Sequence, residues 1–237
     1  MKEKEVKEVI KVKNLEDVTE IYITGIIEDD AWKESWYESE DTYPSDIRDL
    51  LKDAKDEVKV YINSGGGDMF AGVAISNLLK RYKGKTTAII DGLAASAASI
   101  IAFGCDDIEI PKNAYLMIHK PSSACWGDSD DFLKMADTLD TLQKGLVETY
   151  LSKAKEGIDE EKINAYINAE TWFTGKDAGD VFNITIKDEM LVSNIARPGK
   201  VYNKEKMPAC LVESKNTDKR EKEIETMNKG AVAKVLT

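Results

Sequence analysis

One stretch of the chain, residues 89–103, passes from a strand pattern into a helix pattern and carries a serine between them. Its sequence is IIDGLAASAASIIAF. The β-branched residues favour a strand, Asp-Gly is typical punctuation, and the tiny side chains that follow suit a tightly packed helix. We therefore predict that Ser96 lies at a strand-to-helix junction, where unpaired backbone N–H groups stabilise negative charge. The alternative is a buried helix in which Ser96 and Ser99 only bond local carbonyls.

The segments around this stretch alternate between strand and helix patterns. We predict strands at residues 21–27, 58–62 and 86–90, the first buried on both faces, and helices after residues 44 and 68. A glycine loop at residues 63–68 would join the second strand to its helix. Two short strands, 107–110 and 114–118, follow, and the second ends at His119. This order predicts the α/β class.

The C-terminal half supplies a long helix and a charged end. Apolar residues at three- and four-residue spacing predict an amphipathic helix over residues 130–154. A shorter helix capped by Asp159 and a last strand pair near residues 184–192 follow. We divide the chain into a charged segment 1–17, a body 18–195 and a tail 196–237, which we expect to be disordered because it is polar and poorly periodic.

Composition narrows the class of partner. A formal charge of −11 argues against nucleic acid and anionic membrane surfaces as partners. Three cysteines without metal-ligand spacing fit a reducing cytosol. The longest nearly uncharged apolar run, residues 92–104, is too short to span a bilayer, which takes about 20 residues. We expect a cytoplasmic protein that is not exported.

The residues also suggest nucleophilic catalysis. A serine attacks only when a neighbouring base takes its proton and a third group orients that base. His119 is the one histidine in the chain, so a serine, histidine and acid site must use it, although a lone histidine is more often a packed residue. Backbone N–H groups of the glycines at 65–67 could bind an oxyanion, but a glycine cluster is usually just a loop.

Four motifs occur in an order that resembles the Clp protease proteolytic subunit. They are YINSGGG at 61–67, AGVAI at 71–75, GLAAS at 92–96 and MIHKP at 117–121. Three further features resemble the Clp-like head maturation (prohead) proteases of tailed phages: Asp-Gly before the serine motif, WGD at 126–128 and AETW at 169–172. The resemblance spans roughly residues 18–192.

The resemblance implies roles for individual residues. Ser96 would be the nucleophile and His119 the general base, with the N–H groups of Gly67 and Ala97 as the oxyanion hole. Where the family has an aspartate ahead of an aromatic, this chain has Glu170, and Asp177 is a reserve for that role. Gly65 also replaces the proline of the family's strand-loop motif.

The resemblance further implies a Clp/crotonase-like α/β spiral of β-α-β units with a protruding long helix. It implies peptide or protein substrates, a homo-oligomeric ring (a heptamer or double ring) and neither cofactor nor metal. The chain has no ATP-binding motif, so an ATP-driven unfoldase would be a separate protein.

Four functions remain open at this stage. The leading one is a serine endopeptidase that cleaves scaffold and capsid proteins during phage head maturation, located in the host cytosol or inside proheads. The alternatives are a bacterial degradative peptidase that works with an unfoldase, a non-catalytic ring component, and an acyl-CoA enzyme of the crotonase type. Crotonases do not need the serine and histidine pair, which disfavours the last.

Overall fold

The computed structural model describes residues 12–14, 17–33 and 40–188. All of them lie within one compact unit, Met1–Tyr202. Of the predicted segment 1–17, the structure describes residues 12–14 and 17. The predicted tail 196–237 lies outside the described residues, as does the end of the strand pair expected near 184–192. Among the described helices, none is both long enough and apolar enough to cross a membrane.

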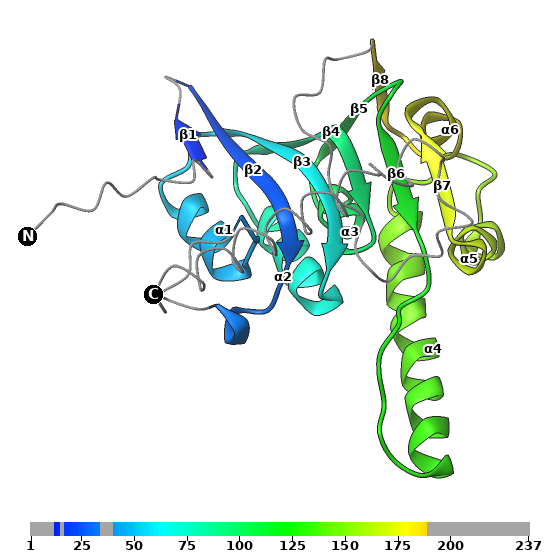
Figure 1. Cartoon of the computed structure of the whole chain (residues 1–237). Coiled ribbons are helices and arrows are strands. Elements are labelled where there is room, and N and C mark those ends of the chain that lie inside the picture. The colour runs from blue at the N-terminus through cyan, green and yellow to red at the C-terminus, as the bar shows by residue number, and fades with distance from the viewer. Residues whose placement is uncertain (1–11, 15–16, 34–39, 189–237) are drawn as a thin grey trace, which may run out of the picture. The chain divides into compact units, whose positions relative to one another are not determined.

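The described elements alternate between strands and helices through most of the chain (Figure 1). The strands are β1 (Val12–Asn14), β2 (Val18–Ile27), β3 (Glu57–Gly67), β4 (Lys85–Ala95), β5 (Asp107–Pro111), β6 (Tyr115–Ile118), β7 (Thr171–Thr174) and β8 (Thr185–Lys187). The helices are α1 (Pro44–Lys52), α2 (Met69–Lys80), α3 (Ala97–Ala102), α4 (Ser129–Leu151), α5 (Glu160–Ala169) and α6 (Gly175–Val181), with a 3-10 turn, η1, at Asp30–Trp32.

The strands form one mixed sheet in the order β1-β2-β3-β4-β5-β8. The pairs from β2 to β8 along this path are parallel, whereas β1 joins the edge antiparallel to β2. Strand β6 also pairs with β4, in parallel, and β7 pairs antiparallel with β6. Parallel neighbours need crossover connections, and α1, α2 and α3 supply them. The α/β class and the Clp-like arrangement predicted from the sequence are confirmed.

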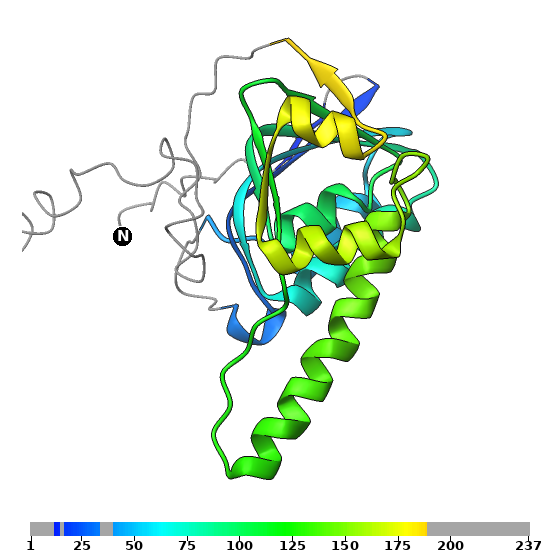
Figure 2. The same cartoon turned by 90° about the vertical axis from the view of Figure 1, so that its right-hand side faces the viewer.

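Helices α1, α2 and α3 cover one face of the sheet (Figure 2). The prediction that residues 21–27 are buried on both faces is wrong, because side chains of β2 alternate. Ile21 and Ile23 are fully buried against the helices, whereas Tyr22 is half-buried and Ile26 is 51% exposed. No helix of the described chain covers the second face over β2, so only alternate residues of the strand enter the core.

The packing of α2 on α3 depends on small residues. A Cβ atom added to Gly72 would lie 3.0 Å from Ala97 Cβ, and one added to Gly104 would lie 2.5 Å from Ser76 Oγ. The two backbones can approach this closely only because no larger side chain separates them. The tiny side chains after Ser96 therefore serve helix packing, as the sequence indicated.

Strands β3 and β4 continue well past their predicted ends at residues 62 and 90. Strand β4 continues through Asp91 and Gly92 to Ala95, so the predicted strand end at residue 90 is wrong, and α3 begins at Ala97. Strand β3 likewise continues through the three glycines to Gly67, which pairs with Ile27. The predicted glycine loop is thus the end of a strand, because neighbouring strands supply hydrogen bonds that override local propensity.

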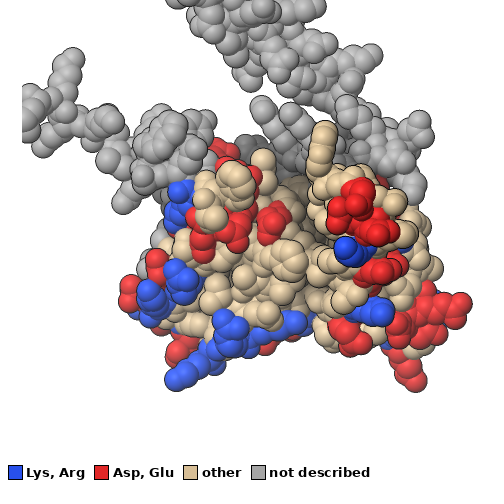
Figure 3. Space-filling view, turned by 90° about the horizontal axis from the view of Figure 1, so that it is seen from below, with Lys and Arg blue, Asp and Glu red and all other residues tan. Residues whose placement is uncertain are grey.

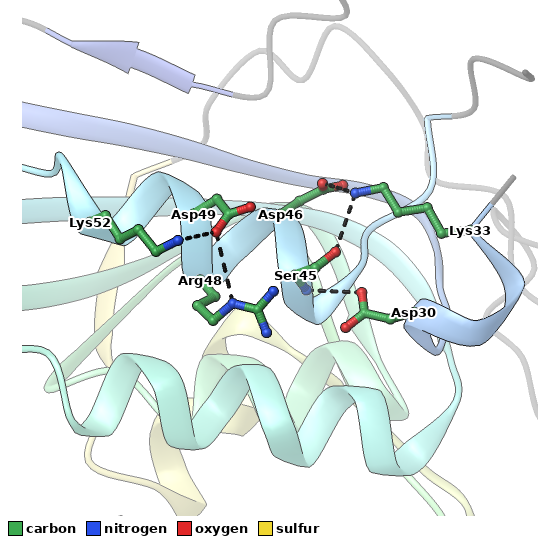
Figure 4. Close-up of polar contacts among 7 residues, drawn as sticks. All are labelled: Asp30, Lys33, Ser45, Asp46, Arg48, Asp49 and Lys52. Carbon is green, nitrogen blue, oxygen red and sulfur yellow. Dashed lines mark hydrogen bonds and ion pairs between the residues drawn. The ribbon is translucent and has the colours of Figure 1, made fainter. Parts of the chain in front are cut away.

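Polar contacts connect η1 to the start of α1 (Figure 4). Ser45 N–H donates to Asp30 Oδ1 at 3.0 Å, and Lys33 Nζ donates to Ser45 Oγ at 3.2 Å and pairs with Asp46. Helix α1 starts with Pro44 at its first position, where the missing N–H carries no penalty. These contacts connect Asp30 and Lys33 to the first turn of α1.

Helix α4 confirms the predicted long amphipathic helix and starts at a capping box made by Asp128 and Asp131. Its C-terminal half buries Leu146, Val147 and Tyr150 in the core. Its N-terminal half extends away from the sheet and leaves Phe132 54% and Leu133 66% exposed (Figure 2).

Helix α5 lies beside α4 and is capped by Asp159, as predicted. Gln143 of α4 donates to Asn164 and Asn168 of α5.

Candidate active site

Ser96 occupies a sharp turn between β4 and α3. Its backbone has φ 54° and ψ −123°, a region that costs a non-glycine residue about 1–3 kcal/mol. The Ser96 N–H donates to the Met117 carbonyl at 3.0 Å, and the Ser96 carbonyl accepts from Ser99 N–H at 2.9 Å. This strained turn places the half-buried serine at the start of the helix. The sequence predicted the junction but carried no signal for the strain.

His119 lies beside Ser96 because of how β6 pairs with β4. Ala95 is level with Met117 in this parallel pair, so the residues just beyond the two strand ends are neighbours. His119 Nε2 lies 2.7 Å from Ser96 Oγ, within hydrogen-bond distance. A neutral imidazole that accepts at Nε2 is the arrangement that lets a histidine take the serine proton.

Glu170 is brought to His119 by the antiparallel pairing of β6 with β7. Ile118 is level with Thr171, so continuing the register by one residue places Glu170 next to His119. Glu170 ends α5 in a left-handed conformation, with φ 52° and ψ 70°. A non-glycine residue in this conformation is uncommon, and such residues cluster at functional sites.

Two opposing effects act on the pKa of His119. Burial lowers it from its ordinary value, and the negative charge of Glu170 acts in the opposite direction. Burial is the larger effect, so the imidazole is held in the neutral form that a general base needs at neutral pH.

Asp177, the reserve for the acid, has a structural position instead. Its carboxylate accepts from Thr174 Oγ1 at 2.7 Å and from Thr174 N–H at 3.3 Å, forming the capping box of α6. The signal was present in the sequence, because a threonine followed three residues later by an acid is typical of a helix start.

The glycines that end β3 contact the serine turn. A Cβ on Gly66 would lie 2.8 Å from Ser96 Cβ and 2.9 Å from Ala97 N, and one on Gly67 would lie 2.1 Å from the Ile27 carbonyl oxygen. Gly66 and Gly67 also have positive φ, 90° and 154°. The predicted donors Gly67 and Ala97 therefore belong to backbone segments that touch. Sequence reasoning missed Gly66, which lets these segments approach.

The surface beside Gly67 is apolar and acidic. Ile26 Cγ2 lies 2.9 Å from the position of a Gly67 Cβ, and Phe70, at the start of α2, is 61% exposed. Burial and the charges of Asp41 and Asp68 raise the pKa of Glu28 in the same region. Figure 3 views the molecule from below and shows uncharged residues bordered by groups of acidic side chains and, on the left and below, by lysine and arginine side chains.

Within the part of the chain that the structure describes, no group of three or more His, Cys, Asp and Glu side chains is placed to hold a metal ion. Burial raises the pKa of the Cys105 thiol to about 12, so Cys105 is a core residue without nucleophilic character.

A comparison with protein families matches residues 46–182, more than half of the chain, to the family described as Clp protease. This range contains Ser96, His119 and Glu170. The chain belongs to the Clp protease family. The roles assigned to these residues, and to Gly67 and Ala97, remain predictions that the geometry now makes specific.

Several curated proteins are similar to this Clp protease family member. It is 29% identical over 130 residues to ATP-dependent Clp protease proteolytic subunit 3 of Rhodococcus jostii, covering 54% of this chain and 63% of the relative. It is 28% identical over 130 residues to ATP-dependent Clp protease proteolytic subunit 1 of Streptomyces avermitilis, covering 54% of this chain and 58% of the relative. The matched part of the chain thus spans about three fifths of the length of these relatives.

Proposed function

We propose that this chain is a serine endopeptidase of the Clp type. The observation that carries the proposal is the 2.7 Å contact between His119 Nε2 and Ser96 Oγ, on a strained turn beside two glycines with positive φ. The charge of Glu170 acts on the same histidine. Membership of the Clp protease family supports the same reaction class.

The proposed reaction has two stages. His119 Nε2 takes the Ser96 hydroxyl proton as Oγ attacks the substrate carbonyl carbon, and the N–H groups of Gly67 and Ala97 stabilise the oxyanion. The imidazolium then gives its proton to the leaving amine as the C–N bond breaks, which leaves an acyl-enzyme. Water, deprotonated by His119, hydrolyses the ester and regenerates Ser96. Glu170 would orient the ring and stabilise its charged form.

We propose a homo-oligomeric ring, a heptamer or double ring, as the working form. The exposed N-terminal half of α4 supports this, because it presents Phe132 and Leu133 to solvent and follows Trp126, which is 99% exposed. Large apolar side chains gathered on one projecting segment are typical of interaction sites. Sedimentation or mass photometry would give the ring size. A purely monomeric full-length chain would contradict the proposal.

The finer proposal is that the substrates are scaffold and capsid proteins of a tailed phage, cleaved in the host cytosol or within proheads. The phage-type features at residues 126–128 and 169–172 support it. The second candidate is a degradative peptidase with a separate ATP-driven unfoldase, which the names of the relatives support, since both are called ATP-dependent Clp protease proteolytic subunits. Cleavage of co-expressed scaffold protein without an unfoldase favours the first candidate, and activity that requires an unfoldase favours the second.

Labelling with a fluorophosphonate tests the proposed chemistry directly. We expect the assembled wild-type chain to react at Ser96, and we expect Ser96→Ala and His119→Ala to lose both labelling and peptide hydrolysis while still assembling. Ser123→Ala, in an exposed loop, is the matched control and should behave as wild type. Absence of labelling in an assembled wild-type ring would instead identify a non-catalytic member of the family.

A further inference from the structure

A chain of two buried hydroxyl groups connects helix α4 to the backbone of Ser96. Ser99 Oγ donates to the Ser96 carbonyl oxygen at 2.6 Å, and Tyr150 of α4 lies with its hydroxyl 2.8 Å from Ser99 Oγ. Because the single Ser99 proton is given to the carbonyl, the Tyr150 hydroxyl must be the donor in the second contact. The chain therefore runs in one direction, from Tyr150 through Ser99 to Ser96.

The position of Tyr150 is determined by aromatic packing. Its ring meets Phe103 edge to face at a centroid distance of 5.0 Å and lies 6.5 Å from Phe182. Ser99 is completely buried and Tyr150 is almost so. Burial also raises the pKa of Tyr150, so its hydroxyl stays protonated. Hydrogen bonds between groups buried in this way are strong and polarise one another.

The carbonyl at the end of this chain belongs to the same peptide group as the Ala97 N–H. That peptide is trans, so the Ser96 C=O and the Ala97 N–H point in opposite directions. The carbonyl already accepts from the N–H groups of Ser99 and Ile100, and the Ser99 hydroxyl is its third donor. Donors that hold and polarise the C=O orient the N–H and make it a stronger donor.

We propose that Tyr150 and Ser99 are positioning residues that orient the Ala97 N–H toward the oxyanion. They do not touch substrate, and they act through the Ser96–Ala97 peptide. This inference rests on the proposed function. It adds that Tyr150, in the buried last turn of α4, helps to stabilise the transition state. The backbone at Ser96 is strained, so these hydrogen bonds would also oppose rotation of the Ser96–Ala97 peptide plane toward a less strained conformation.

The test compares Tyr150→Phe, Ser99→Ala and the double variant, in the full-length assembled protein. Removing an oxyanion donor costs about 10²–10³ in kcat. Loss of its orientation should cost less, and we expect kcat to fall about tenfold for each single variant while KM changes less than about twofold. Because both residues belong to one chain, the double variant should be no slower than the slower single variant.

A second readout separates positioning from general destabilisation. A peptide boronate forms a tetrahedral adduct with Ser96 whose oxygen occupies the oxyanion position, whereas a product peptide does not. We expect boronate affinity to fall in parallel with kcat and product-peptide affinity to stay unchanged. The matched control is Tyr82→Phe, which also removes a hydroxyl hydrogen bond, to the Lys55 carbonyl, but far from Ser96. It should keep the wild-type kcat.

The outcomes of this test distinguish two failures. If wild type does not react with fluorophosphonate, the proposed function itself is wrong. If wild type reacts and Tyr150→Phe keeps the wild-type kcat and boronate affinity, only the positioning role is overturned. Equal losses of boronate and product-peptide affinity would also overturn it, because they indicate a structural effect on binding.

Discussion

Gly66→Ala is the substitution that most directly tests the packing of the candidate site. Two costs add at this position. The backbone has φ +90°, which an L residue rarely adopts, and the new Cβ would lie 2.5 Å from the Ala95 carbonyl oxygen and 2.8 Å from Ser96 Cβ. Ala95 belongs to a buried strand and Ser96 to the turn itself, so moving either residue away from the new Cβ would disturb the surrounding packing.

Two other glycines separate these costs. Gly157 has φ +85° but open space around its Cβ position, so Gly157→Ala measures the backbone cost alone, about 1–2 kcal/mol. Gly145 lies inside α4 with nothing within 4 Å, so Gly145→Ala should stabilise the protein by about 1 kcal/mol. Forcing extra volume into a packed site costs about 1–3 kcal/mol. We therefore expect Gly66→Ala to lower the free energy of unfolding by about 2–5 kcal/mol.

Urea unfolding of the three variants, followed by circular dichroism, measures these differences, and fluorophosphonate labelling reports the state of Ser96. We expect Gly66→Ala to label at least tenfold more slowly even where it is folded, because its Cβ pushes against the turn at Ser96, whereas both control variants label as wild type. The reasoning is refuted if Gly66→Ala is no less stable than Gly157→Ala and labels normally, since Cβ contacts at Gly66 would then carry no cost.

Three further predictions concern single side chains. Glu170→Gln removes the charge that raises the pKa of His119, so the acid limb of the kcat/KM profile should move to lower pH while the plateau falls; an unmoved limb would separate Glu170 from the histidine. Asp177→Ala should cost about 1 kcal/mol of stability through the α6 cap and leave that limb in place, whereas a shifted limb would restore it as the acid. Asp68→Ala removes the N-cap of α2, whose Oδ1 accepts from Ala71 N–H at 2.7 Å, and should cost about 0.5–2 kcal/mol in the same urea assay.

The candidates for nucleophile and base could be named from the sequence where residue identity restricts the choices. His119 was the one histidine available, and Ser96 followed a strand pattern and preceded a run of small residues. Glu170 was predicted only through the resemblance, as a glutamate where the family has an aspartate, and the pairing of β6 with β7 places it beside His119. Asp177 was the reserve for this role, and the structure places it in the α6 capping box.

Other features could not be predicted because they depend on contacts between distant segments. Gly66 has no side chain that could signal its role, and its importance comes from the turn at Ser96, 30 positions away, which it touches. The link from Tyr150 to Ser99 joins helices whose separation in the sequence hides their contact. The true ends of β3 and β4 likewise depend on neighbouring strands.

By itself, the sequence determined the alternation of strands and helices and the set of groups able to act as nucleophile and base. Local patterns suffice for these, because periodicity and side-chain chemistry are properties of the residues themselves. Only the tertiary structure decided that Ser96, at the end of β4, lies next to His119 and that the serine occupies a strained turn. It also decided which carboxylate lies beside the histidine. Those results depend on strand register and close backbone approach, which arise only when segments far apart in the chain pack together.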